Sequence, residues 1–149
     1  MRYMRNFILN ILLPLCVGAF IYLRYRPASI IFFKWIDMLG VKGILSGLRA
    51  GDYSFHPSSW VIYSLPDALW VYSFTNLMLM IWDYRLSVHS VFWITVAPVI
   101  GCALELGQAL HFIPGTFDIT DFIFILVATL ISYIHYLNNK KPNHVESYP

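Results

Sequence analysis

Residues 60–82, WVIYSLPDALWVYSFTNLMLMIW, form an apolar run whose only charged residue is Asp67. A helix needs roughly 20 predominantly apolar residues to cross the hydrocarbon core of a bilayer. Trp60 and Trp82 stand at the two ends of the run, where membrane helices place aromatic residues at the interface with water. The run therefore predicts a transmembrane helix over 60–82.

Three further apolar runs lie on either side of this one. They cover residues 7–23, 90–112 and 119–137. Pro14 interrupts the first run, and a membrane helix tolerates an internal proline because neighbouring groups satisfy the freed carbonyl. We expect an all-α, polytopic membrane protein with four transmembrane helices. Residues 1–138 form its single domain, and a polar C-terminal tail follows over 139–149.

The composition of the 149-residue chain agrees with this class. Hydrophobic residues make up 58% and charged residues 12%, about half the charged share of a soluble domain. A net charge of +2 is too small for a nucleic-acid-binding surface. Cys16 and Cys102 lie in apolar runs without CxxC spacing, so we interpret them as free thiols. Because HExxH, GxSxG and Walker motifs are absent from the sequence, we expect no cofactor and favour a protein that is not an enzyme.

The segment between the first two runs has a different character. Residues 28–49 are not apolar enough over a long enough stretch to span, and Lys34 and Asp37 share a face among aromatic residues. This pattern predicts a helical segment that lies in the membrane interface or re-enters the membrane. Basic residues divide equally between the two sides, and we favour an orientation with both termini in the cytoplasm.

Polar residues concentrate near one membrane face. Glu105 and Gln108 share a face of the third run, Asp118 and Asp121 open the fourth, and Asp67 lies early in the second. Because an ionisable group at membrane depth is costly, this concentration predicts a functional site. We expect its ligand-binding residues to be Glu105, Gln108, Asp118, Asp121, Asp67, Arg24, Arg26 and Arg49.

Structural roles are the alternatives for the same residues. The motif SLPD over 64–67 resembles a capping box that would start the second helix near Leu65. Asp118 would cap the fourth helix, with Asp121 near the positive end of its dipole. Glu105 lies inside a helix, so its structural role would be an ion pair or hydrogen bond; the candidate partners are Arg24, Arg26 and Arg49. A divalent metal, or protonation of one carboxyl, would also relieve the crowded charge.

The stretch ELGQALHFIPGTFDITD, residues 105–121, resembles the VanZ-like family of small integral membrane proteins. The family pattern is E-x-x-Q, a short loop with P-G-R, and D-x-x-D at a helix start. Thr116 stands at the place of the loop arginine, and Ile125 at the place of a usual asparagine. The resemblance implies a cell-envelope role in the bacterial cytoplasmic membrane, since the founding member is linked to glycopeptide antibiotic resistance. It carries over Glu105, Gln108, Asp118 and Asp121 as motif positions only.

Three functions compete at this point. The first is a protein that binds the headgroup of a lipid-linked or cell-wall precursor, with arginines attracting its phosphates and acids holding its sugar or peptide groups. The second is a structural subunit of a larger membrane complex, whose charges serve helix packing and partner choice. The third is a carboxylate- or metal-dependent intramembrane enzyme or a small transporter. We favour the first, with the lipid bilayer and other membrane proteins as partners.

Overall fold

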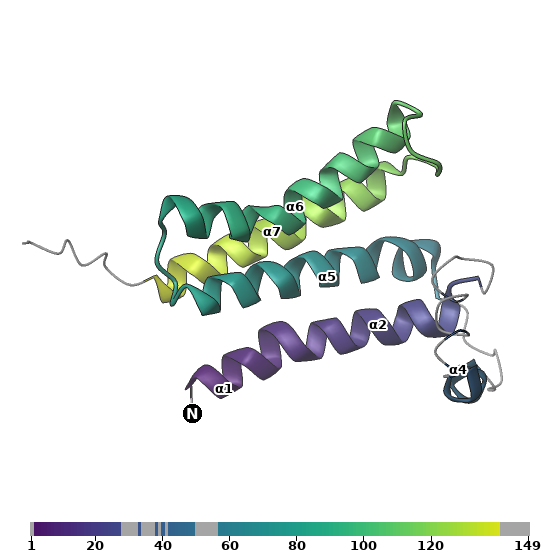
Figure 1. Ribbon diagram of the computed structural model, residues 1–149, viewed down its shortest axis with the longest axis horizontal. Helices are drawn as coiled ribbons and strands as arrows, with labels where there is room; N and C mark the ends of the chain where they lie inside the picture. The colour runs from purple at the N-terminus through teal and green to yellow at the C-terminus, as the bar shows by residue number, and fades with distance from the viewer. Residues whose placement is uncertain are drawn as a thin grey trace, which may run out of the picture.

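The computed structural model describes residues 2–27, 33, 38, 40, 42–49 and 57–140. Every regular element within these ranges is a helix, so the expected all-α class is confirmed (Figure 1). In chain order the helices are α1 (Arg2–Phe7), η1 (Ile8–Leu12), α2 (Leu13–Tyr25), α4 (Lys42–Arg49), α5 (Ser59–Ile81), α6 (Val88–Ala109) and α7 (Ile119–Asn139).

Three helical stretches are long and apolar enough to cross a membrane. They are Tyr3–Tyr25, Val88–Ala109 and Ile119–Asn139 within the described part of the chain. The chain is therefore a helical membrane protein. The helix α5 has the length of a span, at 23 residues, but is not among the three.

The first stretch is one continuous helix made of α1, η1 and α2. Its wide π-helical turn at Ile8–Leu12 lies immediately before Pro14. Proline has no backbone N–H and crowds the carbonyl of the preceding turn, and a π-turn is one of the local adjustments that accommodate it. The helix starts at Arg2, five residues before the expected start at residue 7.

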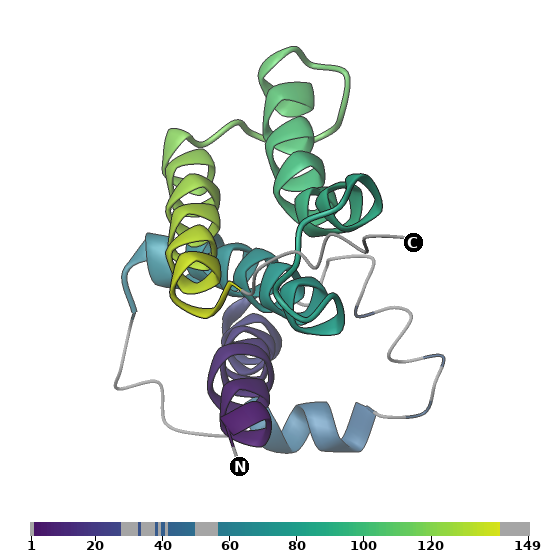
Figure 2. The same ribbon diagram turned by 90° about the vertical axis from the view of Figure 1, so that its left-hand side faces the viewer.

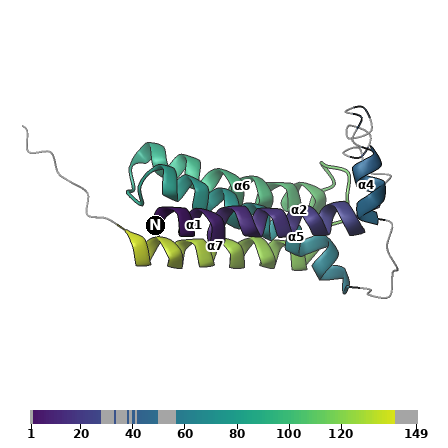
Figure 3. The same cartoon turned by 90° about the horizontal axis from the view of Figure 1, so that it is seen from below.

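The helix α5 lies at the centre of the bundle and contacts α2, α6 and α7 (Figures 1 and 3). Its buried polar side chains face these neighbours instead of lipid. Asn76 Nδ2 donates to Ser132 Oγ of α7 at 3.0 Å, and Tyr72 OH donates to Asn10 Oδ1 of η1 at 2.8 Å. A central helix has little lipid-facing surface, so it carries more polar residues than its neighbours without exposing them to hydrocarbon.

One predicted helix start is confirmed and one predicted end is wrong. The helix α5 begins at Ser59, one residue before the expected start at Trp60, and it contains Pro66, so the alternative start near Leu65 is wrong. The helix α6 ends at Ala109, three residues before the expected end, because His111 adopts a left-handed conformation with φ 60°. The Phe112 N–H then donates to Gly107 O at 2.8 Å, which closes a Schellman motif and stops the helix.

The start of α1 and the end of α7 lie at one end of the bundle (Figures 1 and 2). The end of α2, the start of α5, the α6–α7 loop and α4 lie at the other, which we call the site end. The helix α4 runs crosswise to α2 and is amphipathic (Figure 2). Of the segment 28–49, only Phe33, Met38, Gly40 and α4 are described; Lys34, Asp37 and the tail beyond 140 lie outside the described residues.

Replacing Asn76 by alanine should lower the free energy of unfolding by about 0.6 kcal/mol, the average for polar contacts between membrane helices. The substitution removes the donor to Ser132, and reversible unfolding in mixed detergent micelles measures the loss. Ser73→Ala is the matched control, because Ser73 is equally buried on α5 and its Oγ has no partner in the described structure. Equal losses of unfolding free energy in Asn76→Ala and Ser73→Ala would contradict a stabilising role of the Asn76–Ser132 hydrogen bond.

Candidate functional site

An arginine and an aspartate meet where α2 ends beside α5. Arg26 Nη2 lies 3.4 Å from Asp67 Oδ2 and donates to the Tyr63 carbonyl at 3.0 Å. The guanidinium carbon lies 5.3 Å from the ring centre of Tyr22 and 4.9 Å from that of Tyr63. This stacking and pairing fix the direction of the Arg26 side chain, because Arg guanidinium planes favour aromatic faces and carboxylates. Asp67 remains half exposed, at 51% of its side chain.

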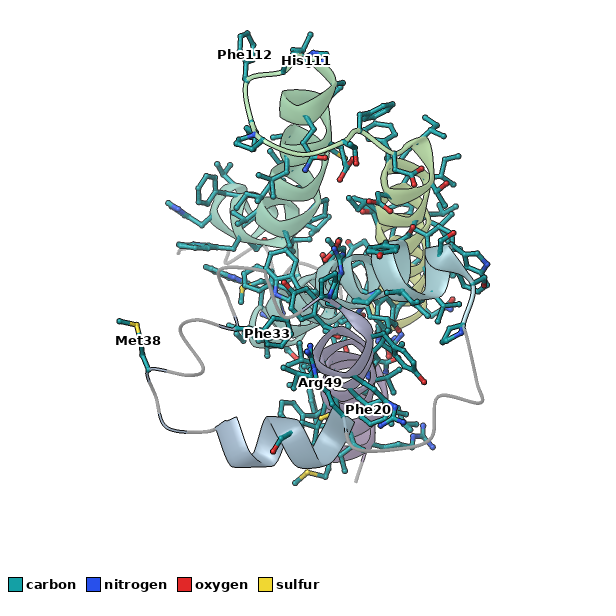
Figure 4. All side chains as sticks on the ribbon, turned by 90° about the vertical axis from the view of Figure 1, so that its right-hand side faces the viewer. Phe20, Phe33, Met38, Arg49, His111 and Phe112 are labelled. Carbon is teal, nitrogen blue, oxygen red and sulfur yellow. The ribbon has the colours of Figure 1, made fainter. Side chains whose placement is uncertain are left out.

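A second arginine ties α4 to the end of α2. Arg49 Nε donates to Leu23 O at 2.9 Å, and its Nη2 donates to Arg26 O at 2.7 Å. Its guanidinium carbon lies 4.3 Å from the centre of the buried Phe33 ring (Figure 4). These carbonyls belong to the last turn of a helix, where a cation is also favoured by the helix dipole. Arg49 therefore serves as a structural clamp, whereas the sequence predicted it as a ligand-binding residue.

Glu105 is buried in α6, with 7% of the residue exposed. Its Oε2 accepts a hydrogen bond from the Asp118 backbone N–H at 3.5 Å. Within the described part of the chain, Glu105 forms no ion pair with Arg24, Arg26 or Arg49, and the structural role that the sequence offered for it takes the form of this hydrogen bond. The charges that act on its carboxylate are those of other acids, namely Asp121, Asp67 and Asp118.

Asp118 and Asp121 occupy the start of α7. Asp118 is the N-cap, and its Oδ1 accepts from the Thr120 N–H at 2.8 Å, which confirms the capping role. These hydrogen bonds lower the pKa of Asp118 below its ordinary value. Asp121 lies in the first turn, as expected, and its Oδ1 is buried without a hydrogen-bond partner in the described structure. A buried acceptor of this kind is available to a donor from a ligand or a water.

The remaining motif residue, Gln108, packs against the loop that leaves α6. A Cβ placed on Gly115 would lie 2.8 Å from Gln108 Cδ, so a larger residue at 115 would displace the Gln108 side chain. Gly115 also has a φ of 146°, which other residues rarely adopt. Gln108 therefore holds the loop against the last turn of α6, as a packing group. Arg24 is the remaining arginine that the sequence predicted for the site. Its guanidinium carbon lies 5.7 Å from the ring centre of Tyr25.

A groove between α2 and α5 leads to the Arg26–Asp67 pair. Its volume is about 300 Å³. It is lined by Leu15, Gly18, Ala19, Tyr22, Leu23, Pro66, Asp67 and Trp70. The walls are apolar along α2, and the polar members Tyr22 and Asp67 both belong to the Arg26 cluster. The groove is thus apolar along its length and charged at the site end.

The arrangement combines acceptors and one arginine, but it gathers no metal-ligand set. Within the described residues, no group of three or more His, Cys, Asp or Glu side chains could hold a metal ion. Sequence reasoning missed the aromatic residues Tyr22, Phe33 and Tyr63 that stack on the arginines. The alternation of tyrosine and arginine in Tyr22-Leu-Arg-Tyr-Arg26 is the signal that could have indicated such stacking.

Comparisons of the chain with protein-family models, with curated proteins and with solved structures find no match. The resemblance of residues 105–121 to the VanZ-like family therefore stays a prediction.

Replacing Arg49 by alanine should release α4 from the end of α2, because both carbonyl contacts and the Phe33 contact are lost. Hydrogen bonds to a charged group contribute about 1.5–3 kcal/mol, so amide exchange over 42–49 should accelerate roughly tenfold or more. Hydrogen-exchange mass spectrometry measures it. Arg49→Lys should restore only part of the protection, since lysine lacks the planar fork. Unchanged exchange in the alanine variant would refute the clamp.

The Asp118 cap should contribute stability that depends on pH. Because its folded pKa lies below the unfolded value of about 3.9, the contribution is present above that value and disappears as the pH falls through the folded pKa. Asp118→Asn retains a capping oxygen at every pH. Thermal unfolding is measured from about pH 7 down to about pH 3, a range that reaches the ordinary pKa of an aspartate. The wild type should lose stability relative to Asp118→Asn at the acid end of this range. Parallel curves would contradict this.

Proposed function

We propose that this chain is a VanZ-like, multi-pass protein of the bacterial cytoplasmic membrane that binds the polar headgroup of a lipid-linked or cell-wall-related molecule. The observation that carries the proposal is the apolar groove between α2 and α5 that ends on the Arg26–Asp67 pair. A cleft of this kind fits an amphiphile, with its chain along the groove and its headgroup at the charged end.

The helix α5 is the fourth transmembrane span in this proposal. Its polar side chains are buried against α2, α6 and α7, so its lower hydropathy does not disfavour insertion as part of the bundle. Four spans put the start of α1 and the end of α7 on one side of the membrane, in agreement with their common end of the bundle (Figure 1). The crosswise, amphipathic α4 is then an interfacial helix at the opposite face.

The headgroup chemistry follows from the groups left available at the site end. Arg26 Nε is buried without an acceptor in the described structure, and its charge attracts phosphate. Asp121 Oδ1 is a buried acceptor without a donor, which suits a hydroxyl, amide or ammonium group. Asp67 connects the two groups electrostatically, since it pairs with Arg26 and its charge also interacts with that of Asp121.

The spatial relation between the two halves of the VanZ-like motif supports the family assignment. Glu105 of the first half accepts from the backbone of Asp118 in the second, across thirteen positions of sequence. The motif thus joins the end of one membrane helix to the start of the next. That is a reason for E-x-x-Q and D-x-x-D to occur together at this spacing.

Lipid analysis of the purified protein tests the proposal. Arg26→Gln should lose most of a co-purifying phosphate-containing amphiphile, at least about tenfold if a charge-assisted contact of 1.4 kcal/mol or more is removed. Arg85→Gln is the matched control, because Arg85 is an exposed arginine that lies 3.9 Å from Asp83 at the other end of the bundle. Identical lipid profiles in wild type and both variants would refute the site.

The groove itself has a separate test. Ala19→Phe fills it from α2, whereas Val17→Phe places the same aromatic ring at an exposed position that does not line it. Native mass spectrometry should detect loss of the bound amphiphile in Ala19→Phe and retention in Val17→Phe. Retention in both variants would place the chain of the ligand elsewhere.

A structural subunit is the second candidate, because Arg49, Gln108 and Asp118 already serve contacts inside the protein. In that role, the charges at the site end hold the helices for assembly with larger membrane proteins. Purification in a gentle detergent decides it: a stoichiometric partner supports this role, and a monodisperse protein without one refutes it.

A further inference from the structure

The loop between α6 and α7 exposes large apolar side chains that no described residue covers. Phe112 is 82% exposed, and the other apolar loop residues with a third or more of their surface exposed are Leu110, Ile113 and Phe117. A loop in water is usually polar, with glycine, proline and short polar residues at its turns. This loop has the turn residues Pro114 and Gly115, but its remaining positions are mostly apolar.

The loop does not extend away from the end of α6 but folds back along it. The Phe112 and Ile113 N–H groups both donate to Gly107 O, and Ile113 packs over Gly107 so closely that a Cβ there would lie 2.7 Å from Ile113 Cδ1. The Asp118 N–H then reaches Glu105. Glu105 belongs to the last turns of α6, four residues before Ala109, so this contact holds the start of α7 beside the end of α6. The loop therefore descends beside the final turn of a candidate membrane span.

The exposed loop surface continues the apolar surface of the two helices that it connects. Leu104 and Leu106 of α6, and Ile119 and Ile123 of α7, are exposed next to it. Between Leu106 and Phe117 the sequence contains no Asp, Glu, Lys or Arg. Figure 4, which looks along the bundle from the site end, has His111 and Phe112 at the outer edge of the molecule, far from Arg49 and Phe33.

We propose that residues 110–117 form a membrane-inserted loop, with Phe112 and Phe117 among the lipids at the level of the headgroup–acyl boundary. Lipid is the occupant because the loop is continuous with the lipid-facing sides of α6 and α7 and lies at the depth of the last turn of α6. The level is interfacial and not deeper, because an irregular backbone exposed to lipid is not tolerated within the hydrocarbon. Aromatic side chains favour this interfacial level.

This placement is independent of the headgroup site and depends only on the insertion of α6 and α7. It gives the site end two membrane contacts on opposite sides, the loop beyond α6 and the crosswise α4 beyond α2 (Figure 2). Glu105, Asp118 and Asp121 then lie between these contacts at interfacial depth, where an amphiphile in the bilayer would present its headgroup.

Site-directed spin labelling tests the placement in nanodiscs of phosphatidylcholine and phosphatidylglycerol. Cys16 and Cys102 are first replaced by alanine, and single cysteines are then introduced as Phe112→Cys and Phe117→Cys. Two reference positions calibrate the depth: Ile123→Cys on the exposed face of α7, and Lys140→Cys beyond its end. Far-UV circular dichroism of each single-cysteine protein verifies the fold in each preparation.

The two loop labels should collide readily with oxygen and resist a water-soluble nickel chelate, with nickel accessibility severalfold below that of the Lys140→Cys label and nearer to that of Ile123→Cys. Nickel accessibility equal to that of Lys140→Cys would overturn the proposal, because the loop would then lie in water. Protection from both reagents would overturn it as well, since a protein partner or a second copy would then cover the loop. The two proposals can fail separately. If the loop labels are exposed to lipid but lipid analysis of Arg26→Gln and the wild type gives identical profiles, the membrane-inserted loop stands and the headgroup site is rejected.

Discussion

The central position of α5 is the constraint on which the rest of the structure depends. A helix surrounded by α2, α6 and α7 has no water to satisfy its polar groups, so its neighbours must supply partners. Asn76 donates a hydrogen bond to Ser132 on α7, and Tyr72 donates one to Asn10 on η1. Small residues let the helices approach, as at Gly18, where a Cβ would lie 3.3 Å from Leu69 of α5. The rotation of α5 that satisfies these contacts also turns Asp67 toward the end of α2.

The orientation of α5 explains how the scarce charges of the protein are used. Asp67 meets Arg26, and the main chain at the end of α2 then accepts from Arg49. The two arginines are stacked on aromatic rings, so the site end is a set of cation–aromatic contacts as much as a set of ion pairs. The carboxylates of α6 and α7 have no arginine among the described residues. The site end therefore divides into a neutralised half near α2 and an acidic half near α7.

Much of the fold was predictable from single stretches of sequence. The apolar runs predicted the four long helices, and the ends of α5 and α7 were correct to within two residues. Asp118 was correctly interpreted as a cap because capping depends on a side chain and a backbone N–H two residues away. The end of α6 was wrong, since a histidine in a left-handed conformation, unlike a glycine, gives no clear stop signal.

The site was predictable as a region but not in its pairings. The concentration of Asp67, Glu105, Asp118 and Asp121 at one end of the helices followed from their positions along the runs. Their partners did not, because Arg26 and Asp67 are 41 positions apart and their meeting depends on helix rotation. For Glu105 the sequence left an ion pair or a hydrogen bond open, and the structure gives a hydrogen bond from the Asp118 backbone at the α6–α7 turn.

The sequence by itself determined the class of this protein, the approximate ends of its long helices and the end of the bundle at which its charges gather. These properties depend on hydropathy, on helical periodicity and on contacts within one turn, all of which are local. Only the tertiary structure decided that Arg49 clamps α4, that Arg26 pairs with Asp67, and that the loop after α6 folds back beside it. Such contacts join distant segments, and their free energies depend on how the helices cross and rotate against one another.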